Sequence, residues 1–296
     1  MTGTPTFALP GGFLGVTRRE ADPAIAIAGI PLDIGTTNRP GARFGPDAIR
    51  RASKMLVDGD HPVARRAVTA GLSDVGDFEI ALGDIPASLA LIERQAAPFR
   101  HLITLGGDHS IALPLLRALA KRHGPVGLVH FDAHVDTWPD SFGQPYGHGS
   151  CFYHAILEGL VDPRRMIQIG IRSPVQREVM AWTLGQGVTV LSAQDVHEQG
   201  VAAVTARIRS VAGDAPAYLT FDIDALDPAF APGTGTPEIG GLATWQAQAL
   251  LRGLRGLSFV GMDMVEVAPA YDQAEITVLA AATLVYEYLA LLQPEL

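Results

Sequence analysis

Short apolar runs alternate with stretches of helical periodicity along most of the chain. Runs typical of buried strands lie at residues 24–30, 101–105, 126–131, 166–171, 188–191, 217–224 and 257–264. Helical spacing follows at 46–56, at 111–122 and within about 274–292. A strand followed by a helix, repeated, predicts crossover helices on both faces of a parallel sheet. We therefore expect an α/β fold with three layers, α/β/α, and a central, mostly parallel sheet of about eight strands.

We expect one domain, residues 1–296, because no repeat and no linker-like stretch divides the chain. Polar residues gather where the predicted strands end. The segment HFDAHVDT (130–137) follows an apolar run, and strand geometry would put its alternate side chains on one face. The segment YLTFDID (218–224) repeats this pattern. In open parallel sheets ligands bind beyond the carboxyl ends of the strands, so we expect both segments to border one crevice.

Four aspartates in one crevice would repel one another unless cations balance them. Two divalent metal ions would do so, and two histidines complete an oxygen-and-nitrogen ligand set that suits manganese, with zinc, iron or nickel as alternatives. A lone Asp-x-Asp is often only a turn or a solvated strand end, but its recurrence together with GGDHS (106–110) favours metal. We expect His130, inside its strand, to be a hydrogen-bonded core residue. The candidate ligands are His109, Asp132, His134, Asp136, Asp222 and Asp224.

Charge and cysteine content narrow the class of protein further. The chain has 31 acidic and 22 basic residues, a net charge of −9, which disfavours nucleic acid and anionic membranes as partners and favours a small cationic ligand. Its single cysteine, Cys151, excludes an intramolecular disulfide and a four-thiolate zinc site, and we assign it no role. No apolar run reaches the roughly 18 residues that span a bilayer. We expect a soluble, unprocessed cytoplasmic protein.

Long ordered motifs carry a resemblance to a known family. The segments GGDHS, HFDAHVDT and FDIDALDPAFAPGTGTPEIGG (221–241) resemble the three signatures of the ureohydrolase family, which contains arginases, agmatinases and related guanidino-acid hydrolases. RPGARFGPDAIR (39–50) and VGMDMVEVAPAYDQAEIT (260–277) extend the likeness, which is greatest to bacterial agmatinases. The resemblance implies an arginase-like fold, two Mn²⁺ per subunit, and a homo-oligomer, either a trimer or a hexamer.

The resemblance also implies a role for each matching residue. A hydroxide that bridges the two metals would attack the guanidinium carbon of the substrate. Asp136 would orient this hydroxide, His148 would pass a proton to the leaving amine, and Glu266 would pair with the guanidinium; Thr236 would lie near the substrate. One manganese would be held by His109, Asp132, Asp136 and Asp222, and the other by Asp132, His134, Asp222 and Asp224.

The resemblance leaves the substrate to be decided among guanidino compounds. Arginases carry a serine–glycine–asparagine run before the proton-shuttling histidine, and residues 138–149 here have none, so arginine is disfavoured. We expect agmatine, cleaved to putrescine and urea, because an acidic pocket favours its ammonium. Guanidinobutyrate or guanidinopropionate would need a cation, and Arg39 and Arg172 do not decide the matter. The alternatives from other classes are a single-zinc deacetylase-like hydrolase and a non-catalytic polyamine-binding homologue.

Overall fold

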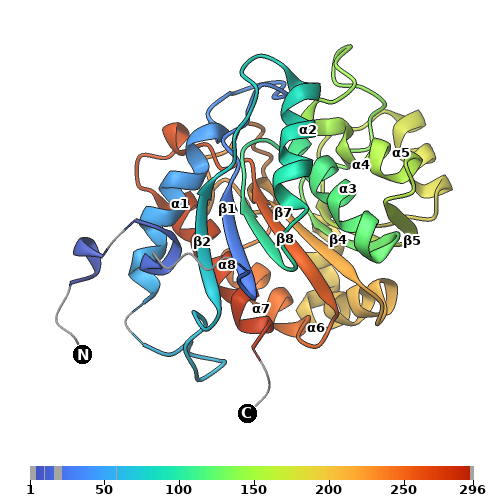
Figure 1. The fold of residues 1–296 in the computed structure, drawn as a ribbon. Coiled ribbons are helices and arrows are strands. Elements are labelled where there is room, and N and C mark those ends of the chain that lie inside the picture. The colour runs from blue at the N-terminus through green and yellow to red at the C-terminus, as the bar shows by residue number, and fades with distance from the viewer. Residues whose placement is uncertain (1–4, 10, 17–21, 58, 294–296) are drawn as a thin grey trace.

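Eight strands form one sheet in the computed structural model, which describes residues 5–9, 11–16, 22–57 and 59–293. All neighbouring strands are parallel, in the order β2-β1-β3-β8-β7-β4-β5-β6 (Figure 1). The predicted α/β sheet is thereby confirmed. The strands are β1 (Ile25–Gly29), β2 (Leu72–Asp77), β3 (Leu102–Leu105), β4 (Val126–Phe131), β5 (Val161–Ile171), β6 (Thr189–Ser192), β7 (Ala217–Asp222) and β8 (Phe259–Val265).

Helices cover both faces of this sheet and make the two outer layers (Figure 1). One apolar core lies under α1 (Gly45–Ser53), α6 (Ala193–Ala212), α7 (Thr244–Gly253) and α8 (Ile276–Leu291). The other lies under α2 (Ile85–Ala96), α3 (Ala112–His123), α4 (Cys151–Leu157) and α5 (Arg177–Gly185). Along β4, Val129 and Phe131 face the first core while Val126 and Leu128 face the second, as strand alternation requires.

Short 3₁₀ helices connect many of these elements, and three of them carry candidate site residues: η5 (His109–Ile111), η6 (His148–Ser150) and η7 (Ile223–Ala225). The others are η1 (Thr6–Ala8), η2 (Phe13–Gly15), η3 (Ala42–Phe44), η4 (Lys54–Leu56) and η8 (Pro269–Tyr271). Within the part of the chain described, no helix is both long enough and apolar enough to cross a membrane.

The strand ends differ from the sequence expectation in a way that matters for the site. Strand β4 ends at Phe131, so Asp132, His134 and Asp136 lie in the irregular segment that follows it. Strand β7 ends at Asp222, and Asp224 lies in η7. Period-two alternation therefore does not bring these side chains together. They converge because the chain turns as it leaves the carboxyl ends of two adjacent strands.

Candidate metal centre and active site

The predicted site residues lie at the carboxyl ends of four consecutive strands of the sheet, β3, β8, β7 and β4. The segment after β3 supplies His109, and β8 is followed directly by Glu266. The ends of β7 and β4 supply the aspartates. Every one of the six candidate ligands except the partly exposed His134 is buried.

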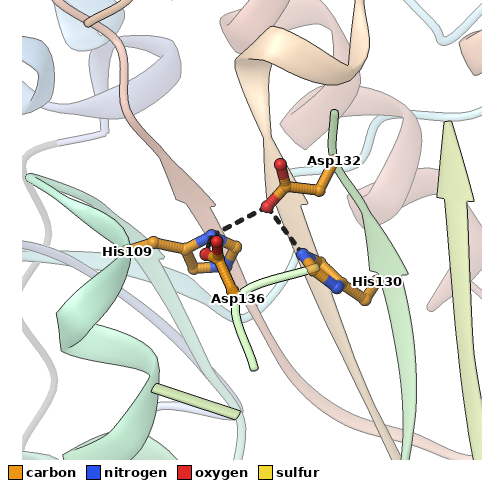
Figure 2. Close-up of side chains that lie close together, drawn as sticks. All are labelled: His109, His130, Asp132 and Asp136. Atoms are coloured by element: carbon orange, nitrogen blue, oxygen red, sulfur yellow. Dashed lines mark hydrogen bonds and ion pairs between the residues drawn. The ribbon is translucent and has the colours of Figure 1, made fainter. Parts of the chain in front are cut away.

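A first cluster surrounds one ring nitrogen of His109 (Figure 2). The Nδ1 atom lies 2.9 Å from Oδ2 of Asp136, 3.1 Å from Oδ2 of Asp132 and 3.4 Å from Oδ2 of Asp222. This nitrogen is buried and has no hydrogen-bond partner in the protein. Three carboxylate oxygens and one free imidazole nitrogen that converge in this way are suitable donors for a divalent cation.

The orientation of the His109 ring is set by a hydrogen-bonded chain behind it. The hydroxyl of Thr220 donates its hydrogen to Asp263, which also accepts a hydrogen bond of 2.9 Å from the hydroxyl of Tyr218. The Thr220 oxygen, 2.7 Å from Nε2 of His109, therefore accepts from that nitrogen. The Nε2–H group is thereby held by Thr220, and Nδ1 is directed at the carboxylates.

A second cluster shares Asp132 with the first. Nδ1 of His134 lies 3.1 Å from Oδ2 of Asp224 and 3.3 Å from Oδ1 of Asp132, while the other oxygen of Asp132 faces His109. The hydroxyl of Thr236 donates to Oδ2 of Asp224 at 3.2 Å, so Thr236 contacts this cluster. One carboxylate thus lies between two imidazole-containing groups of donors.

The carboxylates of this buried region repel one another. Burial, together with the neighbouring Asp224 and Asp132, raises the pKa of Asp222 well above its ordinary value. Burial likewise raises the pKa of Asp224, in spite of the adjacent His134. Because such carboxylates are costly to bury without cations, the donors present fit a binuclear metal centre of oxygen and nitrogen ligands.

Glu266 and His148 form a pair beside the first cluster. Oε1 of Glu266 accepts from Nδ1 of His148 at 2.8 Å and from the backbone N–H of His109 at 2.9 Å. The Oε2 atom of Glu266 is buried and has no hydrogen-bond partner. Burial opposes the charged imidazolium, but the charge and hydrogen bond of Glu266, together with the charges of Asp136 and Asp108, outweigh it and raise the pKa of His148 to about 9. On the far side of the ring, Nε2 of His148 lies 2.7 Å from the hydroxyl of Thr37.

The backbone holds unusual conformations at this site. Asp136 (φ 47°) and Glu266 (φ 62°) adopt the left-handed region, which costs non-glycine residues about 1–3 kcal/mol each. Gly107 is needed for close approach, since a Cβ atom there would lie 1.7 Å from the carbonyl oxygen of Leu32. The carbonyl of Gly107 in turn accepts from the N–H of Glu266 at 2.9 Å, which ties the GGDHS segment to the end of β8.

A cavity of about 560 Å³ opens onto both clusters. Part of its wall comes from the segment that follows Asp136, which is fastened to the loop before α5 by a hydrogen bond of 2.6 Å from Trp138 Nε1 to Gln176 Oε1. Asp140 lies on this wall, and no lysine or arginine is among the described residues that line the cavity. The site residues in the lining are His134, Asp136, His148, Asp222 and Thr236.

Several residues that shape the site were not predicted from the sequence: Thr37, Asp140, Thr220 and Asp263. Of these, Asp263 had a detectable signal, because an aspartate inside the apolar strand FVGMDMV requires a buried partner. Cys151 is buried, with its sulfur 4.0 Å from Asp136 Oδ2. Burial raises the pKa of the Cys151 thiol well above its ordinary value, which keeps it protonated and unreactive.

The fold and the paired clusters define a metal-binding α/β enzyme. The chain belongs to the arginase family, whose model matches residues 23–290. It is 47% identical over 277 residues to the agmatinase of Cronobacter sakazakii. The aligned region covers 91% of this chain and 88% of that protein. The expected ureohydrolase membership is confirmed.

Two solved structures are similar along almost their whole length. Proclavaminate amidino hydrolase from Streptomyces clavuligerus has a TM-score of 0.92 and 37% identity, with 97% of this chain and 98% of that chain covered. A hypothetical agmatinase from Burkholderia thailandensis has a TM-score of 0.91 and 43% identity, with 97% and 92% covered.

Proposed function

We propose that the protein is an amidinohydrolase that cleaves agmatine to putrescine and urea and contains two Mn²⁺ per subunit. The observation that carries this proposal is the position of Asp132 between two imidazole-containing clusters, beside a glutamate with one free buried oxygen. The similarity to the agmatinase of Cronobacter sakazakii supports the choice of substrate.

We infer the ligands from the two clusters and from the resemblance. Oxygen and imidazole donors without sulfur suit manganese. When bound, two such ions lower the pKa of coordinated water, so that hydroxide is available near neutral pH. The first ion would be held by His109, Asp132, Asp136 and Asp222, and the second by Asp132, His134, Asp222 and Asp224.

The chain's own groups bind the substrate and manage its protons. The free Oε2 of Glu266 accepts from the guanidinium, and the two donors already on Oε1 keep this carboxylate fixed. Asp136 accepts a hydrogen bond from the attacking oxygen and thereby orients that oxygen toward the guanidinium carbon. His148, held by Glu266, donates a proton to the amine nitrogen as the carbon–nitrogen bond breaks and urea forms. Thr236 borders the bound guanidinium.

The cavity favours a substrate with a cationic tail. Asp140 is the carboxylate in its lining that lies outside both clusters. Arg172 donates instead to backbone carbonyls, with bonds of 2.7 Å to Asp224 and 2.6 Å to Glu238. The guanidinium of Arg39 lies over the ring of Tyr271, 5.2 Å from its centroid. The carboxylate of guanidinobutyrate or guanidinopropionate would therefore lack a cationic partner. The ammonium of agmatine, in contrast, would have an anionic partner in Asp140.

The test is urea release with agmatine, guanidinobutyrate, guanidinopropionate, arginine and proclavaminate as substrates, using manganese-loaded protein. A higher kcat/KM for any compound other than agmatine would refute the choice of substrate. The number of metal ions per chain, measured by metal analysis, distinguishes this enzyme from a single-zinc deacetylase-like hydrolase, because the donors around His134 support a second ion. One zinc per chain would favour a deacetylase-like enzyme, and no hydrolysis of any compound would favour a polyamine-binding homologue.

We further propose a cytoplasmic homo-oligomer, a trimer or a hexamer. The family resemblance supports the oligomer, and the single buried cysteine suits a reducing compartment. Light scattering of the purified protein measures the subunit number, and cell fractionation measures the location. A monomer, or recovery outside the cytoplasm, would contradict the respective proposal.

A further inference from the structure

His130 lies at the same cluster but is engaged through both ring nitrogens. Its Nε2 lies 2.7 Å from Oδ2 of Asp132, the oxygen that also faces His109 (Figure 2). Its Nδ1 lies 3.2 Å from Nε2 of Gln168, the residue opposite it on the adjacent strand β5. All three side chains are fully buried. His130 is thus the hydrogen-bonded core residue that we expected, and neither nitrogen is left for a metal.

The direction of these hydrogen bonds follows from a backbone carbonyl. The side-chain nitrogen of Gln168 lies 2.6 Å from the carbonyl oxygen of Val135, which can only accept. The amide group of Gln168 is therefore oriented with its NH₂ toward Val135, and its second hydrogen points to His130 Nδ1. That nitrogen must accept, so the ring hydrogen is on Nε2 and is donated to Asp132.

We propose that His130 is a positioning residue that fixes the carboxylate plane of Asp132. The Nε2–H group holds Oδ2 toward His109, while the backbone N–H of His134 holds Oδ1 at 2.6 Å. With a donor on each oxygen, the carboxylate cannot rotate, and its two oxygens stay directed at the two clusters. The proposal rests on the proposed function, in which Asp132 is shared by two metal ions.

The ring of His130 is itself held in place by packing. Its centroid lies 4.5 Å from that of Phe152 and 5.2 Å from that of His109. Hydrogen bonds thus run from the carbonyl of Val135 through Gln168 and His130 to Asp132. The ring of His130 in this series is also held by its contact with Phe152. Removing the Nε2–H donor would leave Oδ2 of Asp132 free to turn away from the first cluster.

The experiment compares H130F, which keeps an aromatic ring but removes the donor, with H130Q, whose amide N–H reaches the position of Nε2. Calorimetric titration of the metal-free proteins with Mn²⁺ should show weaker binding by about 10–100-fold for H130F. H130Q should stay within about 3-fold of wild type, because an orienting hydrogen bond is restored. Q168L, which retains the histidine but removes the donor to Nδ1, should give an intermediate affinity.

A second measurement does not depend on metal. Long-range ¹H–¹⁵N NMR spectra of the metal-free wild-type protein should show His130 with its hydrogen on Nε2, and Q168L should show a mixture of the two tautomers. An Nδ1–H ring in the wild type would overturn the proposal. Equal Mn²⁺ affinity of H130F and wild type, with two ions bound to each, would overturn it as well. A wild-type protein that binds fewer than two ions would instead overturn the proposed function.

Discussion

Replacing Thr220 by valine tests the hydrogen-bonded chain behind His109. Valine has nearly the same shape as threonine but neither donates nor accepts. In T220V, Nε2 of His109 loses the partner that lies 2.7 Å away, and Oδ1 of Asp263 loses the donating hydroxyl. Asp263 keeps only the hydrogen bond from Tyr218. Two buried atoms, Nε2 of His109 and Oδ1 of Asp263, thus each lose a hydrogen-bond partner when one oxygen atom is removed.

The expected loss of stability follows from these two groups. An unsatisfied buried donor or acceptor costs about 1–3 kcal/mol, so T220V should lose about 2–6 kcal/mol for the two of them. The entropy of unfolding is about 2.1 cal/mol/K per residue, or about 0.6 kcal/mol/K for 296 residues. The melting temperature should therefore fall by about 3–10 °C. In the same variant the His109 ring is less well oriented, and Mn²⁺ affinity should fall about 10–100-fold.

The assay is thermal and urea unfolding of the metal-free proteins. A matched control is T234V, because the buried hydroxyl of Thr234 has no hydrogen-bond partner in the protein and its removal should not destabilise the fold. T220S keeps the hydroxyl and should lose only about 1 kcal/mol for the missing methyl group. The reasoning would be refuted by a T220V protein as stable as T234V.

Three further predictions concern other parts of the molecule. E266Q should lower kcat/KM for agmatine by about 10–150-fold, since hydrogen bonds to a charged group are worth about 1.5–3 kcal/mol; unchanged urea release would exclude Glu266 from guanidinium binding. D140N should raise KM by about 2–5-fold with kcat unchanged, as expected for an exposed ion pair, and a changed kcat would contradict a role in binding only. Burial lowers the pKa of His101 to about 4, so the folded state binds fewer protons than the unfolded chain below about pH 6.5. Stability should fall by up to about 3 kcal/mol as the pH drops from 6.5 to 4, and urea titrations of H101F should lack this part of the slope.

The alternation of apolar runs and helical periodicity was enough to predict the layers of the fold. The strand that the sequence did not reveal is β2, whose residues LSDVGD contain two aspartates and a glycine. It lies at the edge of the sheet, where one side of the strand has no neighbour and apolar character is not required. Local pattern therefore identified the apolar strands and missed this polar edge strand.

The sequence motifs correctly located the segments that carry the candidate site residues, but the physical reason given for their convergence was partly wrong. The sequence favoured strand alternation, yet Asp132 and Asp224 follow the ends of strands β4 and β7. Residues that act through long-range contacts had no local signal. Thr37 lies 111 positions from His148 in the sequence, and the residues that flank Thr37 do not indicate its hydrogen bond with His148. Such contacts depend on how distant strand ends are brought together.

The position of β8 in the middle of the sheet has a consequence for biosynthesis. Among the strands of the sheet it is the last to be translated, yet it lies between β3 and β7. Without β8, the other strands fall into two groups that have no hydrogen bonds to each other: β2-β1-β3, which leads to His109, and β7-β4-β5-β6, which leads to the aspartates after β4 and β7. The two groups of candidate ligands can therefore come together only after this strand, which ends at Val265, has been synthesised and has inserted between them.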